Sequence, residues 1–85
     1  MKRTLSLLVN NQLGVLNRLT NLFLRKGLNI ESLAVAPVNE SCISLMTIVV
    51  NVVEEQEVEK IKLQLDKQID VIQITDISEQ IALTN

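Results

Sequence analysis

The chain of 85 residues has no histidine, tryptophan or tyrosine, and Phe23 is its only aromatic residue. The missing histidines remove the most common general base and the most common metal ligand. One aromatic ring is too few for a stacking surface that binds single-stranded nucleic acid. Eight basic residues against ten acidic ones leave no basic footprint for a phosphate backbone. The composition therefore favours a protein that binds a ligand or partner over one that catalyses a reaction.

Cysteine and proline each occur once, and glycine occurs twice. A lone Cys42 cannot build a disulfide framework or a zinc site, so we expect it to be a reduced, small apolar filler. No apolar run approaches the roughly 18 residues of a membrane span. The apolar run at residues 5–9 is too short for a signal peptide. We therefore expect a cytoplasmic protein that binds neither membrane nor nucleic acid.

Aliphatic residues dominate what is present, and apolar residues make up 47% of the chain. A chain of this length holds one domain, and such a domain buries only about 60–65% of the surface that its unfolded chain exposes. This much leucine, isoleucine and valine is more than a small monomer easily hides. We therefore expect a homodimer or a complex with another protein.

Runs of aliphatic residues predict strands, and apolar residues three or four apart predict helices. These patterns give strands at residues 3–10, 28–37, 42–53 and 69–77, and helices at residues 14–26 and 54–67. The order matches the α+β, ferredoxin-like βαββαβ fold. Such a fold has a four-stranded antiparallel sheet with two helices on one face. We assign residues 1–78 to this domain and residues 79–85 to a C-terminal tail.

Local signals predict where the elements lie and how they end. Pro37 has no N–H donor, which places the strand 28–37 at a sheet edge. The apolar phase of that strand changes near Glu31 and Ser32, which is typical of a β-bulge. The continuous apolar run at 42–53 is typical of a central strand. Asn11 or Gln12 is expected to cap the first helix, and Gly27 to end it.

One face of the predicted sheet has no helix over it. We expect Leu8, Met46 and Ile48 to lie on this bare face, which would favour a partner. The edge strand 28–37 also carries unpaired backbone groups beside apolar side chains. We predict that two copies of this strand meet in a homodimer and form one eight-stranded sheet.

The stretch 10–16 carries the clearest functional signal. A strand ends there, a polar turn follows, Gly14 permits close backbone approach, and a helix begins whose first amides have no partner within the helix. Those amides can hold a carboxylate. Asn11 can both donate and accept hydrogen bonds, which suits a zwitterion. An aliphatic lining is offered by Leu13, Val15 and Leu16. One interpretation is a pocket for an aliphatic amino acid; the other is that Gly14 only eases a tight turn.

A second polar interruption occurs where Asn29 and Glu31 open an otherwise apolar strand. They can be the water-facing side of an edge strand. Alternatively, Asn29 faces the Gly14 turn of a neighbouring subunit and completes the pocket. The other charged residues indicate no catalytic site: Asp66, Asp70 and Asp76 are scattered. No serine has a histidine partner. The side chains of Lys2, Arg3 and Arg18 can contact a partner, but we expect them to be solvated.

Taken together, these segments resemble a known family. The sequence reads Asn11-x-x-Gly14-Val15-Leu16-x-Arg18, Asn29-Ile30-Glu31-Ser32-Leu33, Met46-Thr47-Ile48 and Leu65-x-Lys67-x-Ile69-Asp70-Val71. Over about residues 2–77 it is similar to the ACT domain of the small, regulatory subunit of acetolactate synthase, also called acetohydroxyacid synthase. ACT domains in general share the glycine turn, and the other segments are typical of this family.

The resemblance implies a non-catalytic subunit that needs no cofactor of its own. Its partner would be a large catalytic subunit that uses thiamine diphosphate, Mg²⁺ and FAD to make acetolactate from pyruvate, in branched-chain amino-acid biosynthesis. The small subunit would activate this enzyme and confer feedback inhibition by a branched-chain amino acid, typically valine.

By position, the resemblance assigns effector contacts to Asn11, Gly14 and Asn29, with neighbours Leu13, Val15, Leu16 and Ile30. Many family members carry a proline or a small residue where this chain has Leu13. We expect the bulkier Leu13 to narrow the pocket. Many also continue into a second domain of similar length. The alternative function is a free-standing ACT module that senses an amino acid for another enzyme or regulator.

Overall fold

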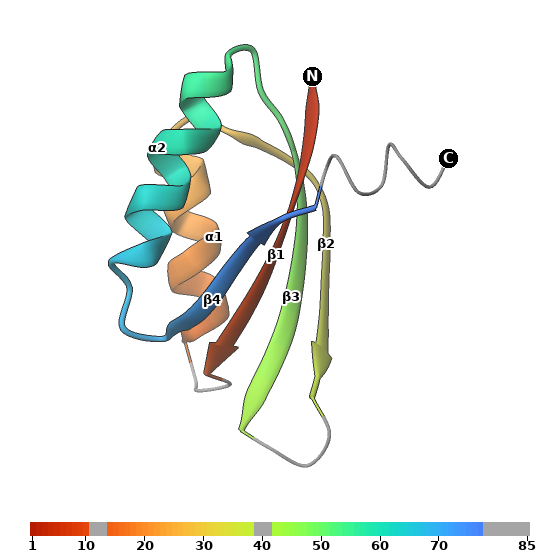
Figure 1. Ribbon diagram of the computed structural model, residues 1–85, viewed down its shortest axis with the longest axis vertical. Coiled ribbons are helices and arrows are strands. Elements are labelled where there is room, and N and C mark those ends of the chain that lie inside the picture. Colours follow the sequence, from red (N-terminus) through yellow and green to blue (C-terminus); the bar gives the residue numbers. More distant parts are fainter. Residues whose placement is uncertain (11–13, 39–41, 78–85) are drawn as a thin grey trace.

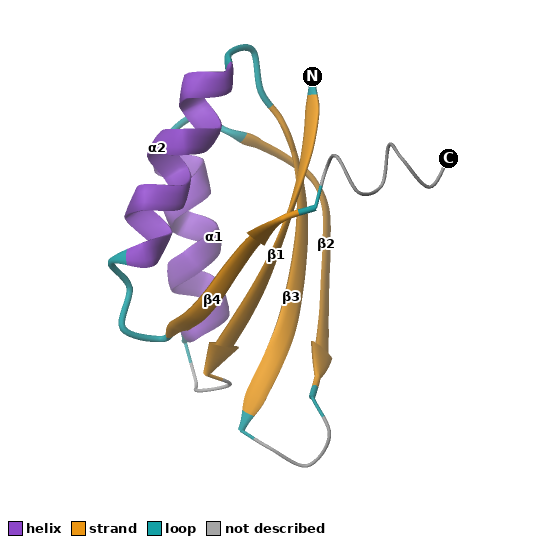
Figure 2. Cartoon of the chain, in the orientation of Figure 1, coloured by secondary structure: helices purple, strands orange, loops and turns teal. Residues whose placement is uncertain are grey.

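The structure is a computed structural model that describes residues 1–10, 14–38 and 42–77. These residues form a four-stranded antiparallel sheet with two helices packed on one face (Figure 1). The elements in chain order are β1 (Lys2–Asn10), α1 (Val15–Arg25), β2 (Asn29–Pro37), β3 (Ile43–Asn51), α2 (Glu55–Asp66) and β4 (Val71–Asp76). The predicted ferredoxin-like βαββαβ fold is confirmed (Figure 2).

The sheet has the order β2-β3-β1-β4, so β1 and β3 are central and β2 is an edge strand. Both positions were predicted, from the continuous apolar run in β3 and from Pro37 in β2. The register of β2 on β3 shifts between Ile30 and Ser32, which confirms the predicted bulge. The bulge lets residues on either side of it keep their own apolar phase.

The two faces of the central strands follow from their register. Leu5 and Leu7 lie directly opposite Ile48 and Met46 in the β1–β3 pair. Residues directly opposite one another share a face of the sheet. All four side chains are fully buried under the helices. The expectation that Met46 and Ile48 lie on the bare face is therefore wrong, and of the three predicted residues only Leu8 lies there, opposite Leu45.

Helix α1 starts and ends at glycines. Its N-cap is Gly14, so the predicted cap at Asn11 or Gln12, which lie outside the described residues, is wrong. At its other end Gly27 takes a positive φ of 74°. The N–H of Leu28 then donates to the carbonyl of Phe23 at 3.1 Å, which closes a Schellman motif and confirms Gly27 as the terminator.

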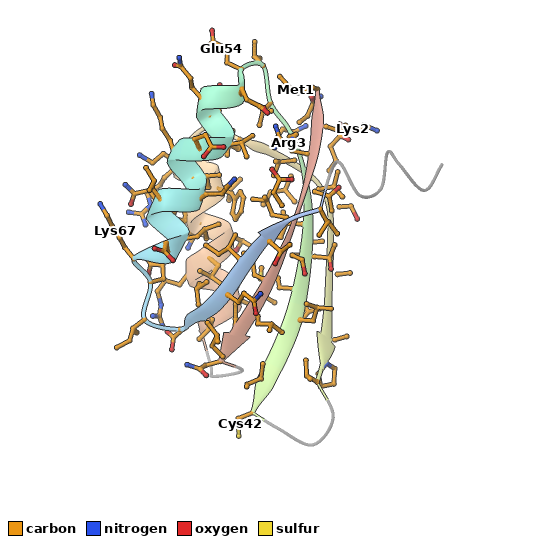
Figure 3. All side chains as sticks on the ribbon, viewed as in Figure 1. Met1, Lys2, Arg3, Cys42, Glu54 and Lys67 are labelled. Atoms are coloured by element: carbon orange, nitrogen blue, oxygen red, sulfur yellow. The ribbon has the colours of Figure 1, made fainter. Side chains whose placement is uncertain are left out.

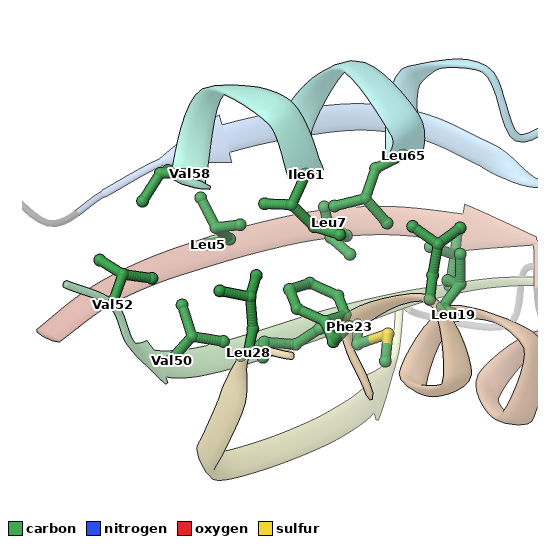
Figure 4. Packing of buried hydrophobic residues seen from close by; sticks show 14 of the residues in the cluster. Leu5, Leu7, Leu19, Phe23, Leu28, Val50, Val52, Val58, Ile61 and Leu65 are labelled. Atoms are coloured by element: carbon green, nitrogen blue, oxygen red, sulfur yellow. The ribbon is translucent and has the colours of Figure 1, made fainter. Parts of the chain in front are cut away.

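Helix α2 begins with a capping box. The side chain of Glu54 accepts a hydrogen bond from the N–H of Glu57, and the side chain of Glu57 accepts one from the N–H of Glu54. Its apolar face, formed by Val58, Ile61 and Leu65, points at β1 and at α1 (Figure 4). Phe23 lies between the two helices and the sheet and is fully buried. This single apolar layer is the core of the domain.

Charged side chains form ion pairs between separate strands and helices that the sequence did not indicate. The guanidinium of Arg3 bonds to both Asp76 and Glu55, joining β1 to β4 and to the start of α2. Only 15% of the Arg3 side chain is exposed, so the expectation that it is solvated is wrong. Lys2 forms an ion pair with Glu31 at 3.2 Å.

Cys42 lies at the opposite end of the sheet from Met1, Lys2 and Arg3 (Figure 3). It stands just before β3 and its thiol is free and exposed. The expectation that it fills space in the core is therefore wrong, because the core layer ends before this position is reached.

Substitutions on α2 separate the core from the surface. We expect Ile61→Ala to lower the free energy of unfolding by about 2–5 kcal/mol, because Ile61 is fully buried. Leu63→Ala, two residues away on the same helix and 64% exposed, is the matched control and should change it by about 0.5 kcal/mol or less. Urea denaturation of both variants tests this. Equal losses would contradict the position of the core.

Candidate functional site

The turn that leads into α1 depends on the backbone of Gly14. This residue has φ 86° and ψ −10°, in the left-handed region that L-amino acids rarely adopt and that achiral glycine tolerates. A Cβ atom built there would meet no other atom within 4 Å. The conformation, and not a lack of space, is what requires glycine. The carbonyl of Gly14 accepts the N–H of Arg18 at 3.0 Å, which is the first hydrogen bond of the helix.

The backbone amides at the start of α1 are the groups of this turn that can donate to a ligand. The N–H groups of Val15, Leu16 and Asn17 precede the first intrahelical bond. Among the described residues, no side chain caps this end, and no acidic residue stands in the first turn. The partial positive charge of the helix N-terminus is therefore not offset there. Such an end favours a carboxylate or another anion.

The side chains around this turn differ in what they can offer. Val15 is 3% exposed and packs into the core, so it presents only its backbone amide outward. Leu16 is 42% exposed and can contact a ligand. Asn11 and Leu13, which were predicted to contact the effector, lie outside the described residues.

Asn29 and Ile30 lie at one end of the sheet, and Gly14 lies near the opposite end. Asn29 is opposite Asn51, which is opposite Lys2 at the start of β1, whereas Gly14 follows the end of β1 (Figure 1). Helix α1 lies between them, and its 11 residues span about 16 Å. The structure therefore does not bring these predicted site residues together within one chain. Ile30 is partly buried against the core.

The far end of β2 lies near the Gly14 turn. Pro37 is opposite Ser44, and Ser44 is opposite Val9, one residue before β1 ends. Two β2 strands paired antiparallel about a two-fold axis would place the start of one beside the end of the other. Asn29 of one chain would then approach the Gly14 end of its partner. A site that uses both residues thus requires two copies of the chain.

The structure adds an ion pair that the sequence analysis missed. Arg18 in the first turn of α1 bonds through Nη1 to Oδ2 of Asp70 at 2.8 Å. The Asp70 side chain is 9% exposed. The sequence analysis found no partner for Asp70 and expected Arg18 to be solvated; the Arg18 side chain stays 49% exposed while it bonds to Asp70. The two residues are 52 positions apart, and no local spacing or motif connects them.

Other kinds of site are not found in the described part of the chain. In residues 1–10, 14–38 and 42–77, no group of three or more cysteine, aspartate or glutamate side chains is arranged to hold a metal ion. Neither α1 nor α2 combines the length and the apolar character needed to cross a bilayer.

Comparisons with known proteins agree on one family. Residues 5–73 match the model of the AHAS small subunit-like ACT domain. The chain is 48% identical over 80 residues to the acetolactate synthase small subunit of Bacillus subtilis, which covers 94% of this chain and 46% of that protein. It is 49% identical over 76 residues to the same subunit of Mycolicibacterium smegmatis, covering 89% and 44%. The chain thus spans about half the length of the curated relatives that it matches.

Solved structures share the fold. The acetolactate synthase small subunit of Thermotoga maritima superposes with a TM-score of 0.80 at 32% identity, over 89% of this chain and 47% of that one. The ACT domain of a GTP pyrophosphokinase from Chlorobium tepidum superposes with a TM-score of 0.77 over 89% and 96%. At 13% identity the second likeness shows the fold alone.

Substitution of Gly14 tests its conformation. We expect Gly14→Ala to lower the free energy of unfolding by about 1–2 kcal/mol, the cost of placing a Cβ atom in the left-handed region. Gly14→Asn should cost less, because asparagine tolerates this region better. Urea denaturation of the two variants measures the difference. If alanine were tolerated as well as asparagine, the left-handed conformation of the turn would be contradicted.

Proposed function

Because the chain belongs to the family of ACT domains found in acetolactate synthase small subunits, we propose that it is a non-catalytic, regulatory subunit of acetolactate synthase. One observation carries the proposal: the match to this family runs over residues 5–73 and includes both the Gly14 turn and the strand that follows α1. A likeness of fold alone would not distinguish this function from that of other ACT domains.

The partner in this proposal is the large, catalytic subunit of the same enzyme. Thiamine diphosphate, Mg²⁺ and FAD belong to that subunit, and we assign no residue of this chain to them. Both subunits are expected to work together in the cytoplasm. The small subunit raises the rate at which the large one forms acetolactate from pyruvate.

The effector in this proposal is a branched-chain amino acid, with valine as the first candidate. Its carboxylate would bind the uncapped amides of Val15 and Leu16, where the helix dipole favours a negative charge. Asn11, and Asn29 from a second copy, would bind the ammonium group or the second carboxylate oxygen. Leu13, Leu16 and Ile30 would contact the aliphatic side chain.

A homodimer through β2 is the second part of the proposal, and the exposed side chains of this edge strand support it. Leu33 and Val35 lie opposite Ile48 and Met46, and therefore on the face that the helices cover. They are nevertheless 39% and 43% exposed, because β2 lies at the edge of the helix layer. A second β2 strand would pair with the open backbone and cover these side chains.

A charge introduced into β2 by substitution should prevent two copies of the chain from forming the proposed dimer. We expect the wild-type chain to sediment as a dimer at tens of micromolar and Val35→Lys to shift it to monomer, because a buried, unpaired ammonium group is costly. Leu63→Lys on the exposed face of α2 is the control and should leave the dimer intact. A wild-type chain that is only monomeric at this concentration would contradict the proposal.

Reconstitution with the cognate large subunit tests the regulatory function. We expect addition of this chain to raise the rate of acetolactate formation, and valine to lower it again. Gly14→Asp should keep the activation but weaken the effect of valine by about tenfold to hundredfold, the loss expected for one charge-assisted hydrogen bond. The carboxylate introduced at position 14 would stand beside the carboxylate of the effector.

Two results would contradict this function. An unchanged rate at saturating small subunit would favour the free-standing ACT module that serves another enzyme. An equal response to valine in wild type and Gly14→Asp would show that the effector binds elsewhere.

A further inference from the structure

We propose that Asp70 is a positioning residue for the α1 entry, by which we mean Gly14 and the first helical turn, residues 15–18. This inference rests on the proposed effector function, because it concerns the amides to which the effector would bind. Asp70 lies in the turn between α2 and β4, far from the α1 entry in sequence. It contacts the end of β1, which precedes the α1 entry, and the first turn of α1.

The first contact holds the end of β1. The N–H of Asn10, the last residue of β1, donates to the main-chain carbonyl of Asp70 at 2.8 Å. This bond uses only backbone atoms, so it does not depend on which side chain stands at position 70. It keeps the turn before β4 beside the point where the chain leaves the sheet.

The second contact holds the start of α1. The Asp70 carboxylate accepts a bond from Nη1 of Arg18 at 2.8 Å, and the Arg18 N–H donates to the carbonyl of Gly14 at 3.0 Å. A single residue thus links the carboxylate of Asp70 to the peptide that Gly14 forms. That peptide also includes the amide of Val15, the first of the uncapped donors.

Burial makes this contact more than a surface ion pair. The Asp70 side chain is 9% exposed, whereas that of Arg18 is 49% exposed. A buried carboxylate needs a partner, because its loss of hydration is costly when nothing replaces it. The guanidinium is therefore held by a carboxylate that cannot turn toward water. The exposed pair of Lys62 and Glu59 on α2, at 3.3 Å, has no such constraint.

The consequence is that the direction of the first amides is fixed from outside the helix. In the part of the chain that the structure describes, no side-chain hydrogen bond holds the N-cap of α1. The two contacts of Asp70 take that role, one on each side of the α1 entry. Removing the carboxylate frees the helix start and leaves the Asn10 bond and the core in place. Effector affinity would fall because the donors are no longer held in one direction.

The test compares Asp70→Asn, Arg18→Gln and the double variant with Glu59→Gln as the control. Amide hydrogen exchange is followed at position 18 and at Leu19, the first bonded amides of α1, and at Ile48 and Val50 in β3. We expect exchange at position 18 and at Leu19 to accelerate about tenfold in each single variant, relative to the intrinsic exchange rate of the residue present, which corresponds to about 1.4 kcal/mol. The double variant should add little, because both changes remove the same contact.

The same proteins are then titrated with valine by calorimetry. We expect about tenfold weaker binding by Asp70→Asn and Arg18→Gln, and unchanged binding by Glu59→Gln. Arg18→Lys should bind with intermediate affinity, because it keeps the charge but loses the planar guanidinium.

The outcomes separate this inference from the proposed function. Unchanged exchange at Arg18 and Leu19 in Asp70→Asn would overturn it. Faster exchange at Ile48 and Val50 as well would also overturn it, since Asp70 would then be only a structural residue. A wild type that binds no valine would refute the effector but not the positioning of the α1 entry, which the exchange data decide by themselves.

Discussion

The packing of two amphipathic helices onto one face of a four-stranded sheet is the interaction on which the rest of the molecule depends. Its apolar layer includes Phe23 from α1, Ile61 and Leu65 from α2, and Leu5 and Leu7 from β1, all fully buried. Burial of side chains of this size stabilises a domain by about 1.5–3 kcal/mol each, before the loss of conformational entropy is subtracted. Among the described residues, no helix lies over the other face of the sheet, where Leu45 is 39% exposed.

The same arrangement decides where ligands and partners can bind. With both helices on one face, the start of α1 lies at an end of the layer, and no described side chain caps its first amides. The edge strand β2 lies beside the helices and is not covered by them. Within one chain, Gly14 and Asn29 lie at opposite ends of the folded domain. An antiparallel pair of β2 strands would bring Gly14 of one copy close to Asn29 of the other. Dimerisation and effector binding are thus two consequences of one geometry in our proposal.

Ion pairs connect elements that the core alone does not align. Arg3 joins β1, β4 and the start of α2 at one end of the domain. At the other end Arg18 and Asp70 join α1 to the turn before β4. These contacts set the relative positions of helix ends, which is where the proposed effector would bind.

The sequence by itself determined the elements, their order and the family. Apolar spacing gave four strands and two helices, Pro37 marked the edge strand, Gly27 marked the end of α1, and the segments around Gly14 and Asn29 indicated an acetolactate synthase small subunit. These signals are local, because they depend on residues a few positions apart. Only the tertiary structure decided which face of β3 is buried, since a continuous apolar run has no alternation to show it, and Met46 and Ile48 were placed on the wrong side. It also decided that Arg18 meets Asp70 and that Asn29 lies far from Gly14 in one chain, because such distances are set by how the chain packs and not by spacing along it.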